Sequence, residues 1–162
     1  SNNNSGSILG SLFMILEGKR TSFNSINATY TEISVMSNTT IMPPNTPGVF
    51  INATERGNLT LNILPNGLYI EQGQASIVTE DGAATARGEE NATTTFISLG
   101  TVNPNGTGSR TGIMFFSTNS TGQLAFLDNL VGIYQIDSSP EGYTIRIREW
   151  KGETIPFETT TN

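Results

Sequence analysis

Short stretches in which apolar and polar residues alternate run along most of this 162-residue chain, separated by turn residues. The clearest is YTIRIREW (143–150), where Tyr143, Ile145 and Ile147 share one face and Arg146 and Arg148 share the other. A period of two places successive side chains on opposite faces of a β-strand. Alternation interrupted by Gly, Pro and Asn therefore predicts an all-β fold.

Eight to ten short strands are expected, and their turns give no period typical of solenoids or propellers. The segment 23–36 shifts phase and is interpreted as one long strand with a bulge near Thr31–Glu32. The other expected strands are 49–53, 58–64, 68–72, 74–79, 83–87, 93–102, 111–118, the end of 124–136 after a short helical turn, and 143–150. Many short strands of this kind predict an immunoglobulin-like or pilin-like β-sandwich.

Composition excludes several classes of function. There are 23 Thr, 15 Ser and 17 Asn, whereas only 14% of residues are charged and the net charge is −6. No run of Lys or Arg is present, so the chain is not expected to bind nucleic acid. The chain has no Cys and no His, which excludes thiol catalysis, a Ser-His-Asp triad and a Cys/His zinc site. We expect no metal and no cofactor.

Candidate catalytic residues are few. Glu89 and Glu90 are interpreted as a solvated pair in a loop, and Asp81 as a turn residue. Asp128 and Asp137 are too isolated to predict a calcium site. Trp150 with Tyr143 fits either a carbohydrate-stacking platform or, preferably, aromatic packing on the core. The chain is therefore not expected to be an enzyme.

Asn-X-Ser/Thr sequons are about twice as frequent as chance allows. Their asparagines are Asn3, Asn27, Asn38, Asn52, Asn58, Asn91, Asn105 and Asn119. Alternation or Gly-containing turns place nearly all of them toward solvent, where N-linked glycans can attach. We therefore expect an extracellular glycoprotein, and the absence of cysteine fits a bacterial or archaeal surface better than a disulfide-stapled ectodomain.

The most apolar segment is ILGSLFMIL, at residues 8–16. It is shorter than the ~20 residues of a membrane helix, so no membrane span is expected. As a strand it is apolar on nearly both faces, which suits the inside of a core. It is either the first strand of its own domain or a donor strand that fills a groove in the next subunit. The donor-strand residues would be Ile8, Leu9, Leu12, Phe13, Met14, Ile15 and Leu16.

The chain resembles the subunits of archaeal thread filaments. The resemblance rests on the apolar N-terminal strand, the Thr/Asn-rich cysteine-free composition, the dense sequons and the segment LAFLDNLVGIYQI…YTIRIREW. It implies a tail over residues 1–18 carrying donor strand 8–16, and a sandwich head over residues 19–162. It further implies a head-to-tail homopolymer, covalent N-glycans, and a cell-surface filament with a role in adhesion or biofilm formation.

The leading hypothesis is therefore a structural filament subunit without enzymatic activity. The first alternative is a monomeric cell-surface adhesin or carbohydrate-binding β-sandwich, in which residues 8–16 form its own first strand. The second alternative, a secreted glycan-active enzyme, rests only on the scattered carboxylates.

Overall fold

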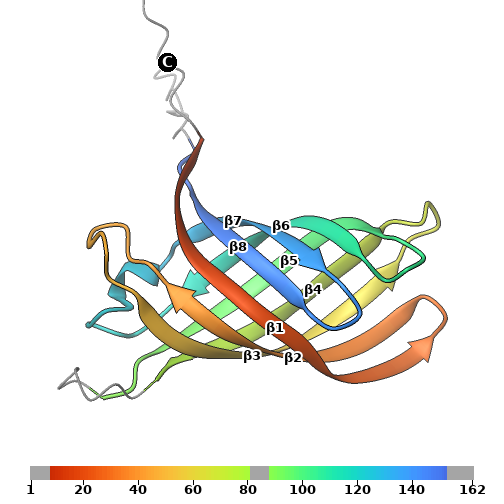
Figure 1. The fold of residues 1–162 in the computed structure, drawn as a ribbon, viewed down its shortest axis with the longest axis horizontal. Coiled ribbons are helices and arrows are strands. Elements are labelled where there is room, and N and C mark those ends of the chain that lie inside the picture. The colour runs from red at the N-terminus through yellow and green to blue at the C-terminus, as the bar shows by residue number, and fades with distance from the viewer. Residues whose placement is uncertain (1–7, 81–87, 153–162) are drawn as a thin grey trace, which may run out of the picture.

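The computed structural model describes residues 8–80 and 88–152, and these form one closed antiparallel β-barrel (Figure 1). Each strand pairs with the next, and β1 pairs with β8 to close the barrel. The strands are β1 Leu9–Asn27, β2 Tyr30–Ile41, β3 Ile51–Ile63, β4 Tyr69–Thr79, β5 Asn91–Val102, β6 Gly108–Ser117, β7 Val131–Ser138 and β8 Tyr143–Trp150. A 3₁₀ turn, η1 (Ala125–Leu127), lies between β6 and β7.

The predicted β-sandwich is wrong, although the all-β prediction is confirmed. The strands form one sheet that closes on itself, rather than two sheets packed face to face. Sandwiches and small barrels both put alternate residues of each strand into one core, so their sequence patterns are alike. Closure depends on the pairing of β1 with β8, for example Leu16 with Ile145, and this pairing leaves no local sequence signal.

Several expected strand boundaries are also wrong. The expected strand 23–36 is a hairpin, because Asn27 Oδ1 accepts hydrogen bonds from the amide and hydroxyl of Thr29 and so forms a turn. The expected strands 49–53 and 58–64 belong to β3, and 68–72 and 74–79 belong to β4. Gly57 and Gly73, which fall between the expected strands, lie within β3 and β4, where a Cβ would stand only 2.8 Å and 2.2 Å from the neighbouring strand.

The two ends of the barrel differ. One end, the loop end, carries the β2–β3, β4–β5 and β6–β7 connections, and the other, the turn end, carries the shorter β1–β2, β3–β4, β5–β6 and β7–β8 connections. The main apolar core lies toward the loop end, where Leu124, which precedes η1, and Leu127 of η1 are fully buried. Phe13 packs edge-on against Phe116 and Phe126. These contacts fill the loop end of the barrel with apolar side chains.

The expected donor strand forms the first part of β1. Phe13, Met14 and Leu16 are fully buried in the core of their own chain. Leu12 and Ile15 are half-buried, whereas Ile8 and Leu9 are exposed. Met14 pairs with Ile41 of β2 on one side and with Ile147 of β8 on the other. The apolar run therefore has a binding partner within the same barrel.

Some sequence predictions lie outside the described residues. These are the leader at 1–7 with Asn3, Asp81 and the expected strand 83–87, and the C-terminal residues from 153 onward. Within residues 8–80 and 88–152, no helix is long and apolar enough to cross a membrane. The same residues contain no group of three or more acidic, His or Cys side chains that could hold a metal ion.

Candidate ligand site in the barrel lumen

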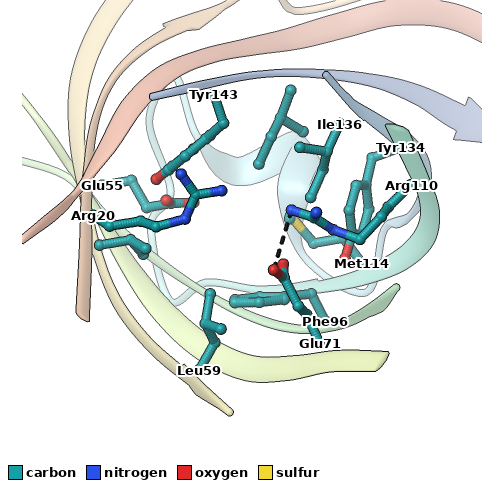
Figure 2. Close-up of a pocket in the computed structure, with 12 residues that line it drawn as sticks. Arg20, Glu55, Leu59, Glu71, Phe96, Arg110, Met114, Tyr134, Ile136 and Tyr143 are labelled. Carbon is teal, nitrogen blue, oxygen red and sulfur yellow. Dashed lines mark ion pairs between the residues drawn. The ribbon is translucent and has the colours of Figure 1, made fainter. Parts of the chain in front are cut away.

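The candidate site lies inside the barrel, toward the turn end, where four charged side chains occupy core-facing positions. Glu55 follows Ile51 and Ala53 on the inner face of β3, and Glu71 shares the inner face of β4 with Ala75. Arg110 lies on the inner face of β6, in phase with the buried Met114. Arg20 of β1 completes the set (Figure 2).

Arg110 and Glu71 form a buried ion pair. Arg110 Nη2 lies 3.1 Å from Glu71 Oε1, and the two side chains are only 2% and 6% exposed. Arg110 Nη1 also donates a hydrogen bond of 3.5 Å to the hydroxyl of Ser138. The Nε–H of Arg110, which can only donate, is buried and has no partner among the described residues. The two Nη atoms of the guanidinium are therefore bonded within the protein, whereas its Nε–H could donate a hydrogen bond to a ligand.

Arg20, Glu55 and Tyr143 lie together on the opposite side of the lumen (Figure 2). Arg20 Nη1 donates a hydrogen bond of 3.1 Å to the carbonyl of Ser139 in the β7–β8 turn. Its guanidinium carbon stands 5.9 Å from the centre of the Tyr143 ring, within cation–π distance. Glu55 Oε1 accepts a hydrogen bond of 3.2 Å from Ser37. Arg20 is held between the turn end and the lumen.

Between these two groups is a cavity of about 30 Å³. This volume holds on the order of two water-sized groups. Three buried polar atoms of the cavity lining have no hydrogen-bond partner among the described residues: Arg110 Nε, Tyr134 Oη and Tyr143 Oη. A buried polar group without a partner costs about 1–3 kcal/mol, so a small ligand that accepts hydrogen bonds from these atoms would be stabilised in the cavity.

The titratable groups of the lumen are strongly perturbed by burial. Burial raises the pKa of Glu55 to about 7, although the hydrogen bond from Ser37 opposes the rise. Burial also raises the pKa of Glu71, and the adjacent Arg110 opposes that rise. The pKa of the Tyr134 and Tyr143 hydroxyls is raised well above its ordinary value by burial. Both tyrosines therefore keep their protons and can donate them in hydrogen bonds.

The balance of charge and of hydrogen-bonding groups favours an acceptor-rich ligand. Below pH 7 Glu55 is largely protonated, so two guanidinium groups face the single carboxylate of Glu71. Arginine has no acceptor, and its N–H groups match carboxylate and other oxyanions. Two tyrosine hydroxyls add further donors. The lumen can therefore bind a small molecule whose oxygens accept hydrogen bonds.

Sequence reasoning missed every charged member of this site. The signal was present as a charged residue in phase with an apolar face, as Glu55 is with Ile51, Ala53 and Leu59. In β6 the same signal is Arg110, two and four residues before Gly112 and Met114. A charge on the inner face of a strand is rarely buried without a partner or a function.

The asparagines of the expected glycosylation sites lie on the outside of the barrel. Those within the described residues are all exposed: Asn27, Asn38, Asn52, Asn58, Asn91, Asn105 and Asn119. Two of the sequons oppose each other across the β2–β3 pair, where Asn38 stands opposite Thr54 and Thr40 opposite Asn52. Attachment of glycans at these positions stays a prediction.

The other candidate residues are not brought together. Glu89 is exposed, but Glu90, expected to be solvated, accepts hydrogen bonds from the hydroxyl of Ser120 and from the amides of Gln123 and Leu124, and so holds the β6–β7 loop. Trp150 is 49% exposed at the end of β8.

Tyr143 begins the same strand and lines the lumen at the turn end. These two aromatic residues therefore share no platform. Asp128 accepts a hydrogen bond from the amide of Thr118, and Asp137 forms an exposed ion pair with Arg146.

The comparisons with known proteins define the fold class and nothing narrower. No family model matches the chain, and no curated protein matches it. A conserved protein of unknown function from Rhodopseudomonas palustris has a similar structure, with a TM-score of 0.65 at 11% identity over 89% of this chain and 98% of that one.

A protein of unknown function from Clostridium acetobutylicum is also similar, with a TM-score of 0.59 at 14% identity over 88% of this chain and 98% of that one. Both likenesses span nearly the whole barrel.

Proposed function

We propose that this protein binds a small, acceptor-rich molecule, such as a small carboxylate or another oxyanion, inside the turn-end half of its barrel. The observation that carries the proposal is the group of buried polar atoms without partners beside the Arg110–Glu71 pair. A ligand that accepts hydrogen bonds from Arg110 Nε and from a tyrosine hydroxyl would satisfy donors that the protein alone leaves unpaired.

The volume of the cavity limits the ligand. About 30 Å³ is far below the ~300–1,000 Å³ of pockets that hold drug-sized ligands, so a lipid or a large cofactor does not fit this arrangement of side chains. A group of a few heavy atoms does fit. Formate and acetate are therefore the first probes, with nitrate and inorganic phosphate testing charge and size.

The experiment is calorimetric titration of the full chain with these four anions at pH 6 and pH 8. We expect the tightest binding for a small carboxylate, and weaker binding at pH 8, where ionised Glu55 adds negative charge to the lumen. Tyr134→Phe removes one buried hydroxyl without removing the ring, and we expect it to weaken binding about tenfold. That corresponds to the loss of a hydrogen bond to a charged group, worth about 1.5 kcal/mol.

Tyr30→Phe is a matched control, because Tyr30 does not line the cavity. It should leave the affinity unchanged. Equal affinity in Tyr134→Phe and the unaltered protein would contradict the proposed site, as would the absence of heat with all four anions.

That the protein is a glycosylated structural subunit of a cell-surface filament, with a role in adhesion or biofilm formation, stays a separate prediction. The position of residues 9–16 between β2 and β8 supports the alternative in which this segment is the first strand of its own domain. We therefore base the proposed function on the lumen.

A further inference from the structure

A second candidate site lies on the outer wall of the barrel, independent of the lumen. It is an open hollow of about 830 Å³ that crosses β1 to β6. Two rows of outward side chains line it, in register across the strands. The first row runs from Ser34 through Asn58, Gln74 and Thr95 to Phe115, and the second from Glu32 through Thr60 and Gln72 to Ile97.

Most side chains that line the hollow are uncharged, and many of them carry both hydrogen-bond donors and acceptors. Asn and Gln each offer two N–H donors and a carbonyl acceptor, and Ser and Thr hydroxyls can do either. Gln72 and Gln74 are both exposed on β4, side by side on the same face. Asn58 Oδ1 accepts a hydrogen bond of 2.9 Å from Ser34, which holds its amide in place. These groups match a partner that is itself covered with hydroxyls.

The charge of the hollow excludes the usual anionic polymers. Glu32 is the single ionisable side chain among its described lining residues, and it accepts a hydrogen bond of 3.1 Å from Asn24. A nucleic acid or an acidic polysaccharide needs cations to replace its counterions, and this surface provides none on a protein of net charge −6. The electrostatics therefore favour a neutral partner.

An apolar edge completes the site. Phe115 is 51% exposed and Ile97 is 44% exposed where the rows reach β5 and β6. The electron-rich face of an aromatic ring attracts the polarised C–H groups of a sugar ring, and the neighbouring amides can bond the hydroxyls at its rim. Adjacent strands are about 4.8 Å apart, so a row across β3 to β6 follows the curved wall for about 14 Å, the length of a short oligosaccharide.

We propose that this outer hollow, here called the amide groove, binds a neutral oligosaccharide that lies across β3 to β6, with one sugar ring stacked on Phe115. Asn58 and Gln74 bond hydroxyls near the middle of the chain. The groove lies on the opposite side of the sheet from the lumen, because its exposed side chains alternate in sequence with those that face the interior. Leu59 and Phe96 border both.

The test is titration of the full chain with neutral hexasaccharides, namely β-1,4-linked glucose, β-1,3-linked glucose, β-1,4-linked xylose and α-1,4-linked glucose. We expect at least one to bind with a dissociation constant below 1 mM. Phe115→Ala and Gln74→Ala should each weaken that binding at least tenfold. Both residues are exposed, so thermal melting should show that the variants remain folded.

Matched controls come from the same barrel. Trp150→Ala removes an exposed aromatic residue outside the groove, and Gln135→Ala removes an exposed amide on β7. Neither should change the affinity. A loss as large in these controls as in Phe115→Ala and Gln74→Ala would overturn the assignment of the site, and so would binding that no groove variant weakens.

Three further results would overturn the proposal. One is no binding of any hexasaccharide at millimolar concentration, and another is preferential binding of an acidic polymer such as polygalacturonate. The third combines two observations on protein from a glycosylating host. Mass spectrometry would find a glycan attached to Asn58, and oligosaccharide binding would appear only in Asn58→Gln, which would mean that the protein's own glycan fills the groove.

Discussion

The two halves of the barrel interior differ in how many charged and polar side chains they contain. At the loop end, Phe13, Ile77 and Leu127 are fully buried in an apolar core. At the turn end, the interior contains Arg20, two glutamates, Arg110 and two tyrosines in addition to apolar side chains such as Val35 and Leu59. Both halves are lined by the same eight strands, so the difference lies in the side chains and not in the backbone.

This difference separates stability from function. Apolar side chains stabilise a barrel without further partners, at about 1.5–3 kcal/mol for each large residue buried. Buried ionisable groups contribute little net stability, because the attraction within the pair is offset by the loss of hydration. A chain that needed only a packed interior would gain by filling the turn end with Leu and Ile. We infer that the turn end is kept polar for a ligand.

The largest predicted effect comes from removing residues 1–17. This deletion takes Met14 and Leu16 from the apolar half and removes the first part of the strand that joins β2 to β8. We expect complete loss of cooperative folding, which corresponds to the whole stability of about 5–15 kcal/mol. Circular dichroism during heating measures it, and a truncated chain that still melts cooperatively would show that β1 is not needed for the barrel.

The full-length chain supplies the matched control, and it also tests the filament hypothesis. Light scattering at increasing protein concentration should give a constant monomer mass if β1 remains in its own barrel. Growth into polymers would favour donor-strand exchange.

The next largest effect concerns the buried ion pair. Arg110→Met leaves the carboxylate of Glu71 buried without its partner, and we expect a loss of about 3–5 kcal/mol in the free energy of unfolding. Replacing both residues, by Arg110→Met with Glu71→Leu, should recover most of this loss or exceed the original stability, while anion binding disappears. Urea denaturation and the formate titration measure the two effects. A double variant no more stable than the single one would contradict the difference between the halves.

A substitution in the apolar half should show the opposite behaviour. Ile77→Ala leaves a cavity in a fully buried position, and we expect a loss of about 2–5 kcal/mol in the free energy of unfolding with no change in ligand affinity. Ile113→Ala, on the outer wall with 40% exposure, is the control and should change stability by about 0.5 kcal/mol or less. A cost at Ile113 equal to that at Ile77 would mean that the outer wall is covered by another molecule.

The last predicted effect, similar in size to that of Ile77→Ala, is the pH dependence caused by Glu55. Its pKa is about 7 in the folded protein and 4.5 in the reference state, so the folded state binds more protons between these two values. The Glu55 contribution to stability is therefore unchanged below about pH 4.5, falls by about 3 kcal/mol as the pH rises to about 7, and then stays constant.

Denaturation of the protein and of Glu55→Gln at pH 5, 6, 7 and 8 isolates this contribution as the difference between the two curves. Glu71, whose pKa is also raised, remains in both proteins and largely cancels in the comparison. Parallel curves would mean that Glu55 is not buried as described.

The sequence predicts local strands better than it predicts their closure. β8 matches its expected boundaries, and the segment 124–136 contains the expected short helical turn followed by the start of β7. Local alternation and turn residues determine these elements. The pairing of β1 with β8 joins residues about 130 positions apart, and no local pattern specifies it, so a sandwich was predicted instead.

The candidate site was missed for a different reason. Glu55, Glu71 and Arg110 are all in phase with apolar residues, so their inward direction could be inferred from the sequence. Their proximity could not, because they lie on three different strands. The pairing of β5 with β4 on one side and β6 on the other brings Arg110 within 3.1 Å of Glu71.

The most direct test of the account is a high-resolution crystal structure of the full chain with sodium formate or acetate. We predict electron density for the anion in the lumen, within hydrogen-bond distance of Arg110 Nε and of the hydroxyl of Tyr134 or Tyr143. A lumen that contains only ordered water at the same anion concentration would contradict the proposed binding function.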